Sequence, residues 1–495
     1  MILTILILLP LLGALVTALV PDALARLVGL GFAAATLVVG IVVATRYSVG
    51  GGMQLEETRT WIESLGVHYA LGVDGLGLLM VLLTVVLVPI VLLASSREAD
   101  AEGNGGVKAF FAWTLALEAM SLAVFTATDV LLFYVVFEAT LIPAYFLIGG
   151  FGRAGRGRAA TKFLIYQLAG GLIMLASVIG LYVVSADAGN PSFLISDLAA
   201  LDIDETTQRW LFVGFFIAFA IKAPMFPVHT WLADTTEKAT TGTSVLLVCI
   251  LDKIGTFGML RFCLGLLPDA SQWATPVVVV LALVSIIYGA LVAIGQDDVL
   301  RLIGLTSLSH FGFIVLGIFV FSPTGSSGAI LYMVNHGIAT ALMFLVAGFL
   351  IRRTGTASIR QMAGVEKSAP VLAGFFLVAG LAACGLPGLS PFVSEMLVII
   401  AAFDHHWLVG SVAVLAIVLA AFYALWMYQR TMTGPDRDGV APVADLDRRE
   451  VGILAPLLLA LVLFGFYPMP LLDVINPFVH DSLASVGIGQ EGGPQ

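Results

Sequence analysis

The sequence predicts an all-α integral membrane protein with about fourteen transmembrane helices. The mean hydropathy is +1.03, and 59% of the residues are hydrophobic while only 11% are charged, whereas a typical soluble protein has about 25% charged residues. Apolar runs of about 20 residues, the length that spans a bilayer, recur along all 495 residues. Because we recognise no alternation of polar and apolar residues, we expect no β-strands.

The expected spans follow one another with short polar connections. The first run has no basic residue before it and no clear cleavage site, so we expect a retained span rather than a signal peptide. The stretch 108–149 is too long for one helix, and the sequence TATD at 126–129 divides it, with Asp129 as the expected N-cap of the second helix. The spans are expected at residues 2–20, 27–45, 71–94, 108–127, 130–149, 161–184, 210–231, 241–262, 275–294, 301–321, 328–350, 371–402, 407–429 and 452–475.

Lysine and arginine are unevenly distributed between the connecting loops. Most of them follow odd-numbered spans, whereas the loops after even-numbered spans hold only Arg46, Arg59, Arg209 and Arg261. The positive-inside rule places Lys/Arg-rich loops in the cytoplasm, which puts both termini on the non-cytoplasmic side. The formal net charge of −10 lies mostly in loops. No basic face for binding nucleic acid is indicated. The lipid bilayer is the expected environment.

Several expected spans carry ionisable residues near the middle of the membrane. At about 1.5 Å per residue, these positions lie roughly 12–18 Å into their spans, and the hydrocarbon core is about 30 Å thick. A Lys or acidic residue at this depth costs about 2.5–3.5 kcal/mol on insertion scales, so it indicates a function by default. The alternative is an ion pair that only holds helices together, and a structural role is equally open for each histidine. The residues are Glu138, Lys222, Lys253, His310 and His336, with Glu395 in a broken span.

Two apolar runs are interrupted beside these charges, one after Lys222 and one before Glu395. Proline removes a backbone donor and bends a helix, and irregular backbone at membrane depth is tolerated only inside protein or beside a cavity. Interrupted segments in both halves of a chain are typical of two inverted-topology repeats with two discontinuous helices. The interrupting residues are Pro224, Pro227, Gly385, Pro387, Gly388 and Pro391.

This pattern suggests five regions along the chain. We expect N-terminal helices 1–3 within 1–107, a first repeat with helices 4–8 within 108–262 and a second repeat with helices 9–13 within 275–430. A last helix at 451–475 and a short tail at 476–495 complete the chain.

Five further residues are secondary candidates: His229, Asp252, Glu118, Asp129 and Asp74. Asp252 precedes Lys253 directly, and because adjacent helical residues do not face each other, we expect it to face a different groove. Glu118 and Asp74 are interpreted as interfacial or capping residues.

Redox groups and metal ions are not expected in this chain. The three cysteines, Cys249, Cys263 and Cys384, are scattered singly through apolar segments, which does not fit a zinc or iron–sulfur cluster. No glycine-rich nucleotide-binding fingerprint follows a strand.

Six stretches of the sequence carry a resemblance to a known family. They are LGVDGLGLLMVLLT (71–84), YVVFEATLIPAYFLIGGFG (134–152), AIKAPMFPVHTWLADTTEKATTGTSVLLVCILDKIGTFGMLRF (220–262), LTSLSHFGF (305–313), YMVNHGIATALMFL (332–345) and GLPGLSPFVSEML (385–397). Together they resemble the antiporter-like proton-pumping subunits of respiratory complex I. Within that superfamily the chain is most similar to the subunit M (chain 4) branch of NADH–quinone oxidoreductase. Glu395 stands where sister subunits usually carry lysine, and the chain lacks the long lateral helix of the L subunit.

The resemblance implies a function and an environment. It implies a Glu138–Lys222 pair, a central Lys253, bridging histidines His310 and His336, and Glu395 as the terminal proton-releasing group. It further implies that NADH, FMN, iron–sulfur clusters and quinone are bound by partner subunits. The neighbours would be the antiporter-like L and N subunits, in a bacterial plasma membrane.

The sequence also departs from the family pattern. After HTWL, where the family usually has Pro-Asp-Ala-His, this chain has Ala233-Asp234-Thr235-Thr236, and Asp252 replaces a usually apolar residue. Two other interpretations stay open. One is a subunit of an Mrp-type Na⁺/H⁺ antiporter or a membrane-bound hydrogenase, and the other is a membrane scaffold whose charges only pair helices.

Overall fold

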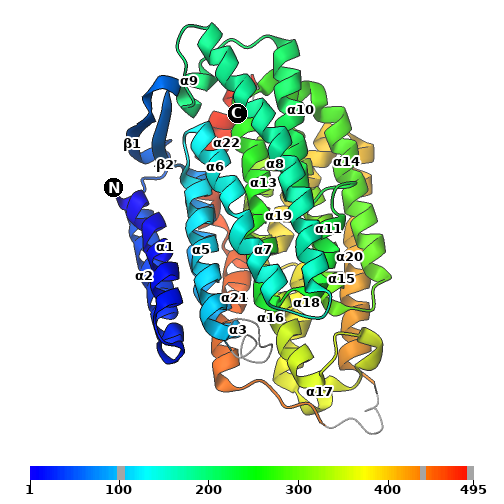
Figure 1. Ribbon diagram of the computed structural model, residues 1–495. Helices are drawn as coiled ribbons and strands as arrows, with labels where there is room; N and C mark the ends of the chain where they lie inside the picture. The colour runs from blue at the N-terminus through cyan, green and yellow to red at the C-terminus, as the bar shows by residue number, and fades with distance from the viewer. Residues whose placement is uncertain (97–105, 435–441, 488–495) are drawn as a thin grey trace.

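The computed structural model describes residues 1–96, 106–434 and 442–487, which form a bundle of long, roughly parallel helices (Figure 1). Within these residues, twelve helices are long and apolar enough to cross a membrane. The two predicted broken segments add two further crossings, which agrees with the expected number. The multi-pass helical fold is thus confirmed, while the orientation in the membrane stays a prediction.

The structure assigns the following helices, with a few one-turn elements between them. They are α1 (Ile2–Leu19), α2 (Asp22–Arg46), η1 (Glu63–Leu65), α3 (Gly75–Ser95), α5 (Gly106–Thr126), α6 (Val130–Ala139), α7 (Leu141–Gly150), α8 (Arg156–Asp187), α9 (Ile195–Ala199), α10 (Glu205–Lys222), α11 (Thr230–Lys238), α12 (Thr241–Leu246), η2 (Leu247–Leu251), α13 (Lys253–Gly258), η3 (Met259–Leu264), α14 (Pro268–Ile294), α15 (Val299–Phe319), α16 (Pro323–Thr354), η4 (Ile359–Gln361), α17 (Val365–Ser368), α18 (Pro370–Ala383), α19 (Ser390–His405), α20 (Trp407–Met432), α21 (Arg448–Phe466) and α22 (Met469–Ser485).

The prediction that the chain has no strands was wrong. An antiparallel hairpin of β1 (Gln54–Ile62) and β2 (Val67–Val73) lies beside the start of α1 at one end of the bundle (Figure 1). Most of β1 is exposed or half-buried, so its sequence carries no alternating apolar face. β2 takes the first residues of the span expected at 71–94, and α3 begins only at Gly75.

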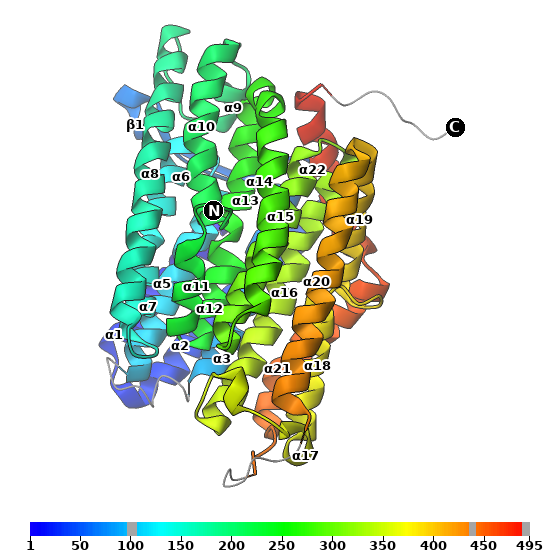
Figure 2. The ribbon, with the colours of Figure 1, turned by 90° about the vertical axis from the view of Figure 1, so that its right-hand side faces the viewer.

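The centre of the bundle is formed by the continuous helical segment 241–264 and by α15, whose apolar windows are completely buried. The pair α1 and α2 forms one edge, while α14 and α20 lie at the opposite edge (Figure 1). Figure 2 shows α18, α19 and α20 grouped along one side of the molecule. Asp252 and Lys253, in the middle of the central segment, are therefore surrounded by protein on all sides.

Both predicted helix breaks are present. The first separates α10 from α11, and the second separates α18 from α19.

The stretch 452–475 differs from the single span that we expected. α21 ends at Phe466 and α22 begins at Met469, because Pro470 at the start of α22 cannot donate its backbone to a continuing helix. The expected tail from 476 thus starts inside α22, and its last residues, 488–495, lie outside the described residues.

α16 and α21 are joined by a buried carboxylate. Both Arg352 and Arg353, in the last turn of α16, form ion pairs with Glu450, which is 1% exposed. Asp447 and Glu450 also form a capping box at the start of α21. The carboxylate therefore neutralises two cations and fixes a helix end at once.

We expect Glu450→Ala to destabilise the protein by about 3–5 kcal/mol, because it leaves two arginines without their buried partner. The measurement is the thermal unfolding midpoint of the detergent-solubilised protein. The control is Arg360→Ala, which removes an exposed pair with Asp297 at 3.7 Å and is expected to cost less than about 1 kcal/mol. Burial alone would raise the pKa of Asp297, but hydrogen bonds from the Ser358 hydroxyl and the Arg360 amide hold it below its ordinary value. Equal losses in both variants would contradict the expectation.

Candidate functional site

The first element of the site is the interruption between α10 and α11. α10 ends at Lys222, and both predicted prolines lie in the irregular segment that follows. Two side chains satisfy the backbone groups that this break releases. The Trp231 indole N–H donates to the Ile221 carbonyl (3.0 Å), and the Phe226 N–H donates to the Ser285 hydroxyl (3.0 Å). The interruption is thus stabilised inside the protein, as membrane depth requires.

Lys222 is fully buried at the end of α10. Its ammonium group donates to the Thr140 hydroxyl (3.1 Å) and lies 4.4 Å from the centroid of the Phe137 ring. The carboxylate of Glu138 interacts electrostatically with Lys222, although the described residues show no ion pair within 4.0 Å between them. Gly171 makes room for Glu138, since a Cβ there would lie 1.7 Å from the Glu138 Oε1.

Lys253 lies at the centre of the bundle, between two π-helical turns, η2 and η3. π-Helical turns within α-helices are frequently found at functional sites. The ammonium group donates to the Val248 carbonyl (3.2 Å) and lies 2.7 Å from Nδ1 of His336. It also lies 4.3 Å from the Phe311 ring centroid. All of these contacts are inside the protein, because Lys253 is 0% exposed.

Two histidines continue from Lys253 toward the second break. The ring centroids of His336 and His310 are 5.1 Å apart, and the Tyr332 ring lies 5.9 Å from that of His310. The Tyr332 hydroxyl donates to Oε1 of Glu395. Buried polar and titratable groups therefore lie side by side from the central helix to α19, joined by hydrogen bonds at the two ends and by ring contacts between the histidines and Tyr332.

The second break supplies backbone groups to the same line. α18 ends at Ala383, and Nε2 of His310 lies 3.2 Å from the Ala383 carbonyl and 3.2 Å from the Tyr423 hydroxyl. Gly385 has a left-handed backbone (φ 67°), and a Cβ there would lie 2.1 Å from Oε2 of Glu395. Glycine at this position therefore leaves the space that the buried carboxylate occupies.

Comparison with known proteins agrees with this geometry. The sequence matches the family described as NADH:quinone oxidoreductase/Mrp antiporter, TM, over residues 127–420. It is 48% identical to NADH-quinone oxidoreductase subunit M of Mycobacterium tuberculosis, over 98% of this chain and 94% of the relative. It is 35% identical to NADH-ubiquinone oxidoreductase chain 4 of Arabidopsis thaliana, over 96% of each chain. The chain belongs to the NADH:quinone oxidoreductase/Mrp antiporter family.

Two solved structures share the fold. A chain of respiratory complex I from Thermus thermophilus with bound NADH superposes with a TM-score of 0.89 at 33% identity, covering 98% of this chain and 100% of that chain. A chain of the Mrp complex from Dietzia sp. DQ12-45-1b gives a TM-score of 0.85 at 21% identity, covering 98% and 99%. The second likeness concerns the fold alone, whereas the sequence relatives confirm the predicted similarity to the subunit M (chain 4) branch.

Two of the secondary candidates in this family member are helix caps. Asp129 accepts from the N–H groups of Leu131 and Leu132 at 2.9 Å and caps α6, as predicted. Asp74 accepts from the Gly77 N–H and caps α3, which confirms its capping interpretation.

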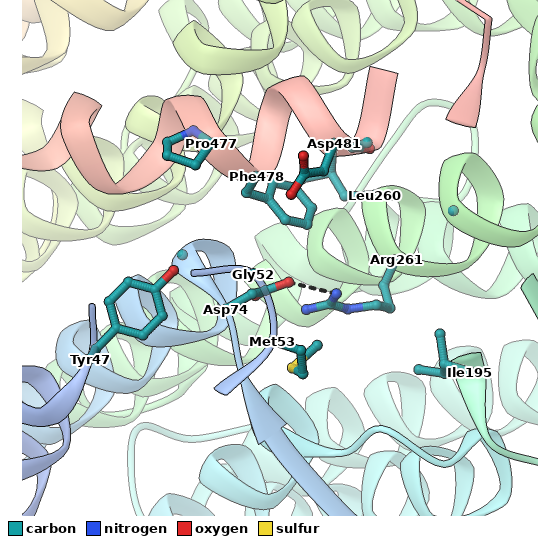
Figure 3. Close-up of a pocket in the computed structure, with 13 residues that line it drawn as sticks. Tyr47, Gly52, Met53, Asp74, Ile195, Leu260, Arg261, Pro477, Phe478 and Asp481 are labelled. Carbon is teal, nitrogen blue, oxygen red and sulfur yellow. Dashed lines mark ion pairs between the residues drawn. The ribbon is translucent and has the colours of Figure 1, made fainter. Parts of the chain in front are cut away.

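Asp74 also forms an ion pair with Arg261 (2.7 Å) in a cavity of about 220 Å³. Figure 3 shows the two side chains pointing toward one another, with Phe478 of α22 nearby. The Arg261 guanidinium lies 5.6 Å from the Phe478 ring centroid. This cluster lies at the end of the bundle that we predict to be non-cytoplasmic, and it joins α3 to α22 rather than extending the buried line.

The interfacial or capping interpretation of Glu118 was wrong. Glu118 lies within α5, is 1% exposed, and neither of its oxygens has a hydrogen-bond partner in the described part of the chain. A carboxylic acid in mid-helix has no backbone donors to cap.

His229 is also buried, and its ring packs near Phe226 (6.0 Å) and Tyr288 (5.2 Å). No contact described in the structure joins His229 to Lys222.

Sequence reasoning missed three hydroxyl groups of the site. Thr140 follows Glu138 by two residues, and Tyr332 precedes His336 by one helical turn, so both lie within stretches already singled out. Tyr423 lies in α20, far from any recognised motif, and no local signal marks it.

A charged cluster at the end of the bundle predicted to be cytoplasmic was also missed. Lys162 and Arg301 both pair with Asp234, at 2.6 and 2.7 Å, and Arg301 pairs with Glu237 at 2.8 Å. A cavity of about 480 Å³ is lined by Lys162, Asp234 and Glu237. The altered stretch after Leu232 lies within α11, and the acids of this helix neutralise the nearby cations.

Proposed function

We propose that this chain is a membrane-arm subunit of a proton-translocating NADH–quinone oxidoreductase. It moves protons through a mid-membrane relay of Glu138, Lys222, Lys253, the two histidines and Glu395, coupled to quinone reduction in partner subunits. The observation that supports this most strongly is the row of buried groups from Lys253 through His336, His310 and Tyr332 to Glu395, in which hydrogen bonds join the end members and ring contacts join the middle ones.

The hydrogen-bond contacts of this line suit proton exchange. The Lys253 ammonium lies at hydrogen-bond distance from His336 Nδ1 (2.7 Å), so a proton can pass between the two nitrogens with little movement. His310 faces His336 on one side and the Tyr423 hydroxyl on the other. A hydroxyl group both donates and accepts hydrogen bonds. Tyr332 and Tyr423 can therefore transfer a proton to a neighbouring group while remaining neutral overall.

The energies are of the size that such a relay needs. Moving one charge across 100 mV costs about 2.3 kcal/mol. Two unit charges about 4 Å apart interact by about 4 kcal/mol at an effective dielectric constant of 20. Bringing a charge to, or removing it from, one member of the relay therefore changes its neighbour's proton affinity by enough to drive transfer against a membrane potential.

The resemblance and the relatives also suggest what surrounds the chain. We place NADH, FMN, iron–sulfur clusters and quinone in partner subunits, and the antiporter-like L and N subunits beside this chain. The Mrp-type antiporter remains the alternative, because its subunits share the fold.

Copurification in a mild detergent distinguishes these two functions. We expect this chain to purify with subunits that carry iron–sulfur clusters and oxidise NADH, detected by their absorbance and by NADH-driven quinone reduction. A preparation that contains only membrane subunits, and that exchanges Na⁺ for H⁺ in vesicles, would contradict the proposal.

A further inference from the structure

The relay has a gap between its first and second halves. Lys222 directs its ammonium group to Thr140 in the turn after α6, whereas Lys253 directs its own to His336 in α16. No hydrogen bond within the described residues joins the two lysines. A proton that arrives at Lys222 thus needs another group to reach Lys253.

Asp252 is the one acidic residue of the central segment 241–264, and the relay has not used it. It is 0% exposed, and neither carboxylate oxygen has a hydrogen-bond partner in the described part of the chain. A buried polar group without a hydrogen-bond partner is costly. Leucine would avoid that cost, so the carboxylate calls for an explanation.

Close packing of two glycines shows which way this part of the helix faces. A Cβ at Gly255 would lie 2.4 Å from the Ala223 backbone nitrogen, and a Cβ at Gly258 would lie 2.4 Å from the Phe219 ring. Residues three apart share a helix face. Asp252 lies three residues before Gly255, about 60° away around the helix, so it lies beside the face that meets the end of α10, where Lys222 lies.

Lys253, the next residue, points elsewhere. Successive helical residues diverge by about 100°, and the Lys253 side chain reaches His336 in α16. The Asp252 carboxylate nevertheless interacts electrostatically with the ammonium groups of both Lys222 and Lys253. The backbone contributes to this placement, because the Asp252 N–H donates to the Leu247 carbonyl (2.9 Å) and ends the π-helical turn η2.

We propose that Asp252 is a further proton-carrying residue, which connects Lys222 to Lys253. Its carboxylate accepts a proton from the Lys222 ammonium and becomes a carboxylic acid, leaving a neutral amine. It then donates that proton to the neutral Lys253 amine, which regenerates the carboxylate and forms the ammonium that faces His336. This inference rests on the proposed function, since it assigns one step of the same relay.

The test is Asp252→Asn in the complete complex, which keeps the size of the side chain and removes its titration. We expect the proton translocation per NADH oxidised by inverted membrane vesicles to fall about tenfold or more, since losing a positioned proton-transfer group typically costs 10²–10⁴-fold. The matched control is Glu118→Gln, which neutralises another fully buried carboxylate without a hydrogen-bond partner and is expected to leave translocation unchanged. Asp252→Glu should restore part of the translocation, because it keeps the carboxylate.

The outcomes separate this inference from the proposed function. Normal translocation in Asp252→Asn, together with loss in Lys222→Ala, overturns the role of Asp252 and leaves the relay standing. Equal losses in Asp252→Asn and Glu118→Gln also overturn it, because the effect would then belong to any buried carboxylate. If the complex with Asp252→Asn does not assemble, the smaller Asp252→Ser serves as the test variant. Normal translocation in Asp252→Ser then overturns the inference. Normal translocation in Lys222→Ala overturns the proposed function itself.

Discussion

Replacing Lys222 by alanine is expected to abolish proton translocation while the complex still assembles. The lysine is fully buried and hydrogen-bonds to the neutral Thr140 hydroxyl, and the described residues show no direct ion pair to it, so its removal breaks no ion pair that holds helices together. Glu138→Ala is expected to act in the same way, because Glu138 is the acid that interacts most strongly with the charge of Lys222. The measurement is NADH-driven acidification of inverted vesicles, with the amount of assembled complex determined in parallel.

The matched control is Lys108→Ala. Within the described residues, the one ion pair of Lys108 is a long pair with the exposed Asp22 (3.9 Å), so the substitution is expected to leave both assembly and translocation unchanged. Wild-type translocation in Lys222→Ala and Glu138→Ala would contradict the role of Lys222 and Glu138 in the first half of the relay. Loss of assembled complex in both variants would instead favour the interpretation in which the charges only hold helices together.

The sequence was sufficient for the features that depend on local physics. Apolar runs set the spans, and Pro224 and Pro387 marked the two places where helices cannot continue. The cost of burying charge singled out Lys253 and Glu395 before any contact was known. These inferences hold because lipid imposes the same requirement on every residue at a given depth.

Features that depend on contacts between distant segments were not predictable in this way. The β1–β2 hairpin carries no apolar alternation, since most of β1 is exposed. Tyr423 and His310 are separated by 113 residues and meet only because α15 and α20 pack together. Glu118 is a further example. Its position in the sequence did not reveal that both of its carboxylate oxygens would be buried without a hydrogen-bond partner in the described part of the chain.

Replacing Glu395 by glutamine is the second substitution with a large expected effect. Glutamine keeps the size of the side chain and can still accept from the Tyr332 hydroxyl, but it cannot take up or release a proton. We therefore expect assembled complex with proton translocation reduced about tenfold or more, in the range for loss of a proton-transferring group. The readout is again translocation per NADH oxidised in vesicles.

Tyr332→Phe separates the hydrogen bond from the proton. It removes the hydroxyl that donates to Glu395 while keeping the ring beside His310, and the Tyr423 hydroxyl at His310 remains as a second route. We expect a partial loss, smaller than that of Glu395→Gln. If Tyr332→Phe and Glu395→Gln are equally impaired, the contact between them positions α19 rather than carrying the terminal proton. If Glu395→Gln translocates normally, proton release must lie elsewhere, because no other acid in the described residues contacts the histidine end of this line.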